Sequence, residues 1–171
     1  ASPATAATHV ASFYKGKTMT IYIGVSAGGG YDAYARMLAR HIVRHIPGNP
    51  RMIAKNYTGA SGLRMLNAIY NVFPQDGTSI AHIGRSLISE PLFGNKGAKF
   101  DGSKIQWLGS FNSENSMFTF WHKSKIKNLD DLLTIPSIVG GIAKGSTIDI
   151  HTRLVNNLLG GKMRLVTGYP G

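Results

Sequence analysis

Hydrophobic and polar positions follow two periods along the chain, and the alternation of these periods predicts regular strands and helices. Over residues 18–25 the apolar side chains Met19, Ile21 and Ile23 occupy every second position, which is the period of a strand. Over residues 31–46 the apolar positions recur every three or four residues, as on an amphipathic helix. Further strands are predicted over 52–55 and 79–83, and further helices over 61–72 and 86–93. This order predicts an α/β fold with a parallel sheet and right-handed crossovers.

A second set of elements follows the Gly-, Lys- and Asp-rich segment 94–112. Strands are predicted over 117–122, 137–142 and 163–166, and helices over 129–134 and 147–159. We therefore expect a first α/β lobe at 15–105 and part of a second lobe at 106–171. Residues 1–14 are expected to form an irregular tail, because the first twelve are small and polar. The chain stops on Gly168-Tyr169-Pro170-Gly171, a loop pattern where a further helix is expected, so the second lobe is predicted to be incomplete.

The amino-acid composition excludes some classes of protein and favours an anionic partner. Apolar residues make up 43% of the chain and charged residues 16%, enough for a hydrophobic core. No apolar run approaches the ~18–20 residues of a membrane-spanning helix, and the absence of cysteine excludes thiol chemistry. The net charge of +11 favours an anionic partner. The basic residues are scattered and form no tract, so nucleic acid is not the expected partner.

Glycine-rich loops follow three of the predicted strands and precede helices, at 26–32, 57–62 and 143–147. In a parallel sheet such loops emerge at the carboxyl edge, where ligands bind. Helix N-termini at this edge offer unpaired N–H groups to a carboxylate or phosphate. The alternative is that each glycine only permits a tight turn. Asp32 is expected to cap its helix or to orient a ligand-bound water, and Arg85 is placed to grip a carboxylate or to lie in solvent.

The first loop also matches two enzyme patterns. Gly24-Val25-Ser26-Ala27-Gly28 fits the nucleophile elbow of serine hydrolases, although only one predicted strand precedes it. Gly28-Gly29-Gly30-Tyr31-Asp32-Ala33 fits a dinucleotide fingerprint, but no acid lies between Asp32 and Asp76 to bind the ribose. His41 and His45 have a metal-compatible spacing without a third ligand. We therefore expect no cofactor and no metal, and a serine hydrolase using Ser26 remains the alternative function.

Four stretches together resemble the Bug-type periplasmic solute-binding receptors of tripartite tricarboxylate transporters. The stretches are Ser26–Asp32 with Ala35-Arg36 beyond it, Asn56–Gly62, Pro74–Thr78 and Gly168–Gly171, and the resemblance runs from about Lys15 to the last residue. It implies two α/β lobes with a small organic acid between them, delivery to membrane permease subunits, a periplasmic location with the signal peptide removed, and no covalent chemistry.

The resemblance also implies where the ligand binds. The loops 28–32 and 56–61 correspond to carboxylate-binding loops of the family, and 145–147 to a contact from the opposite lobe. Thr58 and Ser61 stand where the family commonly has proline and glycine. Because family members are longer, exposed apolar faces and self-association of this chain are expected. The expected ligand-binding residues are Ser26, Ala27, Gly28, Gly29, Gly30, Tyr31, Asp32, Tyr57, Thr58, Gly59, Ala60, Ser61, Gly62, Arg85, Gly145, Ser146 and Thr147.

Overall fold

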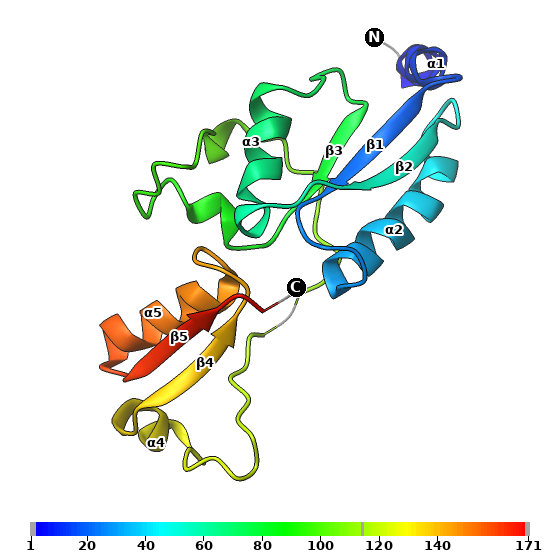
Figure 1. Cartoon of the computed structure of the whole chain (residues 1–171). Helices are drawn as coiled ribbons and strands as arrows, with labels where there is room; N and C mark the ends of the chain where they lie inside the picture. Colours follow the sequence, from blue (N-terminus) through cyan, green and yellow to red (C-terminus); the bar gives the residue numbers. More distant parts are fainter. Residues whose placement is uncertain (1–2, 114, 170–171) are drawn as a thin grey trace.

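The computed structural model describes residues 3–113 and 115–169 and contains two α/β units, each built on a small parallel sheet (Figure 1). The first unit holds α1 (Pro3–Tyr14), β1 (Thr18–Ile23), α2 (Gly30–Ile42), β2 (Arg51–Asn56), α3 (Leu63–Asn71) and β3 (Ser79–His82). The second unit holds α4 (Leu129–Thr134), β4 (Ser137–Gly141), α5 (Thr147–Leu159) and β5 (Met163–Thr167). The predicted mixed α/β class with parallel strands is therefore correct.

The first sheet has the order β2-β1-β3, and β1 runs parallel to both neighbours. Ile21 pairs with Ala54 on one side and with Ile80 on the other. The side chains of Ile21 and Ile23 are buried against Ala35 and Ala39 of α2. The alternation in the sequence thus places one face of the central strand under α2. On the β3 side, α3 packs into a separate cluster formed by Leu63, Leu66, Leu87 and Phe100.

The second sheet contains β4 and β5, which are parallel and joined by α5. Its core consists of Ile126, Leu132 and Met163. Side-chain caps fix where both helices begin: Asn128 accepts a hydrogen bond from the amide of Asp131 (2.9 Å), and Ser146 accepts one from the amide of Asp149 (3.4 Å). Both helices begin and end where the sequence predicts.

The N-terminal segment differs from the expected irregular tail, since Pro3–Tyr14 is the helix α1. Contacts at its end attach it to the first unit. The Tyr14 hydroxyl donates to the carbonyl of Gly77 (3.1 Å), and the Lys17 ammonium lies 3.5 Å from the centre of the Phe13 ring. A helix of small residues carries no strong amphipathic signal, and these tertiary contacts were not readable from the sequence.

Two other predicted elements are also wrong. Residues 117–122 form no strand, because no backbone hydrogen bond joins them to β4 in the part of the chain that the structure describes. The helix predicted over 86–93 is reduced to the 3-10 turn η3 (Leu87–Ser89) followed by further turns. Pro91 lacks the N–H that a continuing helix would need, and its ring disfavours a helical preceding turn. None of the described helices is both long and apolar enough to cross a bilayer.

Candidate functional site

The first glycine loop is held by the carboxylate of Asp32, which is only 4% exposed. The amide of Gly28 donates to Oδ2 of Asp32 (3.0 Å), and Nε of Arg36 donates to the same oxygen (2.9 Å). Nδ2 of Asn56, at the end of β2, donates to Oδ1 of Asp32 (2.8 Å). Gly28 takes a φ of 93°, which is strained for any residue with a side chain. Asp32 therefore braces the loop before α2, instead of capping the helix as the sequence suggested.

These contacts lower the pKa of Asp32 to about 2, from a usual value of 3.8. The hydrogen bond from Arg36 has the largest effect, followed by those from Gly28 and Asn56, and together they outweigh the opposing effect of burial. The carboxylate is ionised at neutral pH and its charge is balanced by Arg36. Arg36 also donates to Oδ1 of Asn56 (2.6 Å), so it links the carboxylate to the end of β2.

The second glycine loop, 57–62, lies beside the first because β1 and β2 are parallel and end together. Ile23 pairs with Asn56 in the ladder, so both loops leave the same edge of the sheet, as the sequence predicts. The loop turns through consecutive left-handed residues, including Ala60 (φ 46°) and Ser61 (φ 55°). A Cβ on Gly24 would lie 2.8 Å from Cα of Gly62, so the close approach of the two loops requires glycine there.

Tyr31 is tied to the third strand. Its carbonyl lies 3.0 Å from Nδ1 of His82, and the His82 ring meets the ring of Phe111 edge-on at 4.8 Å. Burial lowers the pKa of His82 and so favours the neutral imidazole. The first loop is thus fixed from β2 through Asn56 and from β3 through His82.

The loop before α5 in the second unit repeats the arrangement of the first loop. The amide of Gly145 donates to Oδ2 of Asp149 (2.8 Å), and Arg153 donates to both carboxylate oxygens (2.9 Å each). Gly145 has a φ of 80°, and Asp149 is 4% exposed. The shared spacing is Gly-x-x-x-Asp-x-x-x-Arg, at 28–36 and at 145–153. This repeat is visible in the sequence but was not among the predicted features.

The two units meet at this second loop. Oγ of Ser86 and Oγ1 of Thr147 lie 3.1 Å apart and share a hydrogen bond. Glu90, which is 6% exposed, places its carboxylate against Gly145: a Cβ on that glycine would lie 2.8 Å from Oε1 of Glu90. Asn95 donates to the other oxygen of Glu90. The segment after β3 therefore docks onto the N-terminal end of α5.

A pocket of about 390 Å³ opens at this junction. Its polar lining comes from both units: Arg85, Ser86, Ser89, Ser116, Thr147 and His151. The structure thus brings together Arg85 and Thr147, which the sequence places 62 positions apart. The expected ligand-binding residues in the loops 26–32 and 57–62 do not line this pocket. Gly145 and Ser146, which directly precede Thr147 in the sequence, do not line it either. His151 was not among the expected ligand-binding residues.

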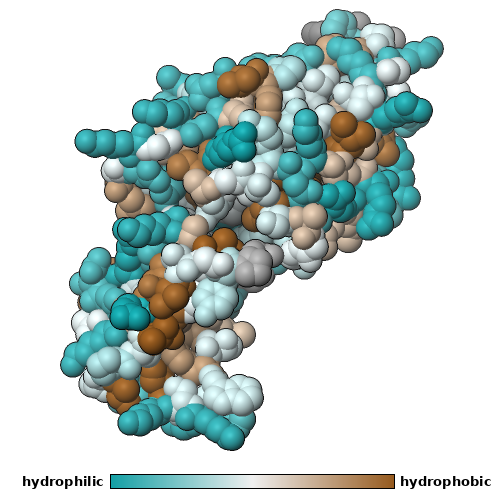
Figure 2. Space-filling view, viewed as in Figure 1, coloured by the Kyte–Doolittle hydropathy of each residue, from teal (hydrophilic) through white to brown (hydrophobic). Residues whose placement is uncertain are grey.

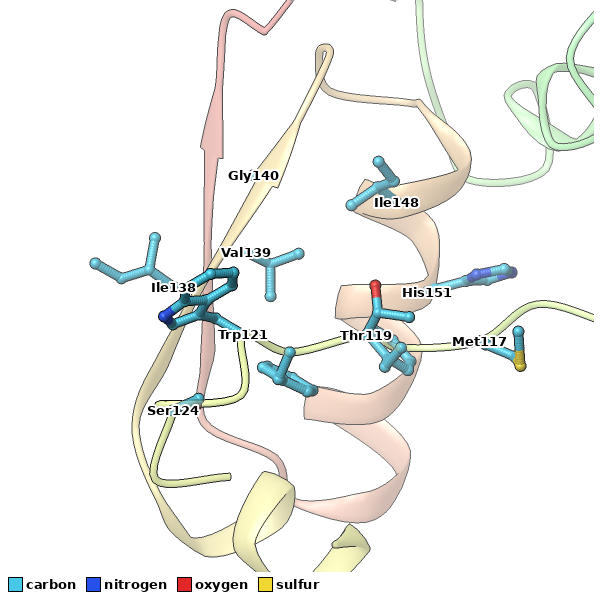
Figure 3. A pocket seen from close by; sticks show the side chains of 11 residues that line it. Met117, Thr119, Trp121, Ser124, Ile138, Val139, Gly140, Ile148 and His151 are labelled. Atoms are coloured by element: carbon cyan, nitrogen blue, oxygen red, sulfur yellow. The ribbon is translucent and has the colours of Figure 1, made fainter. Parts of the chain in front are cut away.

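A second pocket of about 410 Å³ lies beside β4 and α5 (Figure 3). Residues 117–121 form one wall, Ile138–Gly140 another, and Ile148 and His151 of α5 the third. Residues 117–121 belong to the segment that the sequence predicted as a strand. Hydrophobic side chains gather on the surface of the second unit, as Figure 2 shows. In the wall of this pocket, Met117 is 84% exposed and Trp121 is 70% exposed.

Ser26 is exposed in the middle of the loop between β1 and α2. Within residues 3–113 and 115–169, no histidine forms a hydrogen bond with its hydroxyl; His82, tied to the first loop, bonds to Tyr31. His151 belongs to the pocket at the junction of the units, together with Thr147. Among the described residues, no hydrogen bond links Ser26 to a general base.

No protein-family model matches the chain, and a search of curated proteins found no match to it.

Proposed function

We propose that this protein is a periplasmic solute-binding receptor, which captures a small organic carboxylate and presents it to the membrane permease subunits of a tripartite tricarboxylate-type transporter. The proposal includes the finer fold assignment, two lobes of the periplasmic-binding-protein type. The observation that carries it is the pocket between the units, where Arg85 of the first unit and Thr147 at the start of α5 face one space. The loop motifs that resemble the family lend separate support.

The groups in this pocket suit a carboxylate. Arginine can donate two parallel hydrogen bonds to it. Thr147 begins α5, a helix of 13 residues, so the positive end of the helix dipole lies at this pocket. The hydroxyls of Ser86 and Thr147, now bonded to each other, can turn to donate to a ligand oxygen.

The braced loops explain how such a site keeps its shape. An acidic side chain near an anion site would repel the ligand, but Arg153 balances the charge of Asp149 through two hydrogen bonds. The Asp149 carboxylate, with its charge balanced by Arg153, accepts a hydrogen bond from the Gly145 amide and so fixes the loop. Preorganised loops of this kind reduce the entropy that binding costs.

A thermal-shift screen of organic acids on the full chain tests the proposal. A ligand that binds only the folded state raises the melting temperature, so we expect at least one carboxylate to raise it in a concentration-dependent way. The alternative function is tested in parallel with p-nitrophenyl acetate and the Ser26→Ala variant. Turnover that depends on Ser26, with no acid stabilising the protein, would replace the receptor with a serine hydrolase.

A further inference from the structure

The second unit has a distal tip, formed by residues 121–131 and 158–162, at the opposite end from the pocket at the junction. Ile126 packs with Met163, the first residue of β5, so the loop before α4 reaches the amino ends of the strands. Thr147 of the junction pocket instead follows the carboxyl end of β4. Because α5 leads from the end of β4 to the start of β5, its last turn also lies at this tip. Figure 1 shows this end, with α4, at the bottom of the view and away from the first unit.

The loop 121–128 is held in place by one buried side chain and by hydrogen bonds of its backbone. Ile126 is 7% exposed, and its amide donates to Oγ of Ser124 (3.2 Å). The amide of Lys127 donates to Oδ2 of Asp131 (2.9 Å), and the Lys127 ammonium donates to the carbonyl of His122. The loop therefore has a defined shape that does not depend on burying its remaining side chains.

Exposed cations and large apolar side chains gather at the distal tip. Trp121 is 70% exposed, Leu129 58% and Leu158 73%. The lysines outnumber the two acids of these stretches, Asp130 and Asp131. Figure 2 shows hydrophilic and hydrophobic side chains next to one another at this end of the second unit. The exposed members are the cations Lys123, Lys125, Lys127 and Lys162, and the apolar residues Trp121, Leu129, Leu158 and Leu159.

We propose that the distal tip docks the protein onto an anionic lipid surface. Lysines are attracted to anionic headgroups, and their apolar stems can lie along the interface while the ammonium groups stay in water. The indole of Trp121 is amphipathic, and tryptophan is enriched at membrane–water interfaces. Contact with acyl chains removes Leu129 and Leu158 from water, which a nucleic acid, with its charged backbone, would not do. Docking at this end leaves the junction pocket open, and the inference does not depend on the proposed receptor function.

Cosedimentation of the full chain with lipid vesicles tests the docking surface. The vesicles consist of phosphatidylcholine alone or of phosphatidylcholine mixed with phosphatidylglycerol. We expect binding to the anionic vesicles only, and weaker binding as salt screens the charges. The triple variant Lys123→Gln/Lys125→Gln/Lys127→Gln should weaken binding by about 100-fold, at about fivefold for each lysine.

A matched variant controls for the net charge of the protein. Arg40→Gln/Arg51→Gln/Lys55→Gln removes the same three charges from exposed positions of the first unit. These positions lie outside the distal tip, so the variant should weaken binding by no more than about threefold. Circular dichroism verifies that both triple variants are folded.

Tryptophan fluorescence tests the insertion of the apolar side chains. The chain has two tryptophans, so Trp107→Phe leaves Trp121 as the only fluorescent indole. We expect its emission to shift to shorter wavelength with anionic vesicles, because the indole leaves water. Trp121→Phe is the matched variant, and the emission of its remaining Trp107 should not shift.

Three results would overturn the proposal. The first is no binding to anionic vesicles at low salt, or equal weakening by the two triple variants. The second is an unshifted Trp121 emission on bound vesicles, which would show that the apolar side chains do not insert. The third is binding to polyglutamate that depends on the three tip lysines, without binding to vesicles, which would identify an acidic protein as the partner.

Discussion

Asp32 and Asp149 occupy equivalent positions in the two α/β units. Each accepts a hydrogen bond from the amide of the glycine four residues before it, and each pairs with the arginine four residues after it. Both glycines, Gly28 and Gly145, have positive φ angles. The two units thus use the same device to fix the loop between a strand and its helix.

Replacing either aspartate with asparagine should destabilise the protein. The change leaves the arginine without a charged partner and weakens the acceptor for the glycine amide, and we expect a loss of about 1–3 kcal/mol in the free energy of unfolding. Urea denaturation of Asp32→Asn and Asp149→Asn measures it. Asp130→Asn is the matched control, because Asp130 is exposed on α4 and should change stability by less than about 0.5 kcal/mol. Equal effects at all three positions would contradict the bracing role.

The low pKa of Asp32 predicts acid sensitivity. Because its pKa is about 2 in the folded protein and 3.8 ordinarily, the folded state favours the ionised carboxylate. Its contribution to stability is complete above about pH 5 and is lost as the pH falls through 4 toward 2. Urea midpoints measured from pH 6 to pH 2.5 should therefore fall less steeply for Asp32→Asn than for the wild type. Parallel curves for the two proteins would show that Asp32 is not the responsible group.

Ser61→Gly should stabilise the protein. Ser61 has a φ of 55°, a conformation that costs an L-residue about 1–2 kcal/mol and costs glycine nothing. Glycine also loses more entropy on folding, so we expect a net gain of about 0.5–1 kcal/mol, seen as a higher melting temperature. Ser26→Gly is the control: Ser26 has no positive φ, and its replacement should lower the melting temperature slightly. A lower melting temperature for Ser61→Gly would contradict the strain.

Gly145→Ala should loosen the junction between the units. The new methyl group would meet the Glu90 carboxylate at 2.8 Å, and the φ of 80° is unfavourable for alanine. We expect faster proteolysis within residues 106–125, where the chain passes between the units. Gly160→Ala is the control, because that glycine also has a positive φ (73°) but nothing lies within 4 Å of its Cβ position. If Gly145→Ala and Gly160→Ala were cleaved by the protease at similar rates, the Glu90 contact would not be what holds the units together.

Local periodicity was sufficient to predict most of the fold. The limits of α4 and α5 were exact because Asn128 and Ser146 are capping residues that act within their own turns. The prediction of a strand over 117–122 was wrong for a non-local reason. The apolar residues of this segment suit a strand, but a strand forms only where a neighbouring strand pairs with it through backbone hydrogen bonds. The helix α1 was missed because contacts such as Tyr14 to Gly77 are remote in sequence.

The candidate site was predictable loop by loop but not as an assembly. Parallel strand order placed the loops 26–32 and 57–62 at one edge. Which residues face the pocket depends on how the two units dock, through Ser86, Thr147 and Glu90, and no local pattern encodes that docking. His151 was therefore missed, although it lies one helical turn beyond Thr147.

The most direct test of the receptor function is calorimetric titration of the best acid from the screen into the wild type and Arg85→Gln. The account predicts one ligand bound per chain, and binding about 10–100-fold weaker in Arg85→Gln, since a hydrogen-bonded charge pair with the carboxylate is lost. Arg51→Gln removes the same charge from the exposed start of β2 and should leave the affinity unchanged. Equal weakening by both variants, or no saturable binding by the wild type, would contradict a carboxylate site at the junction of the units.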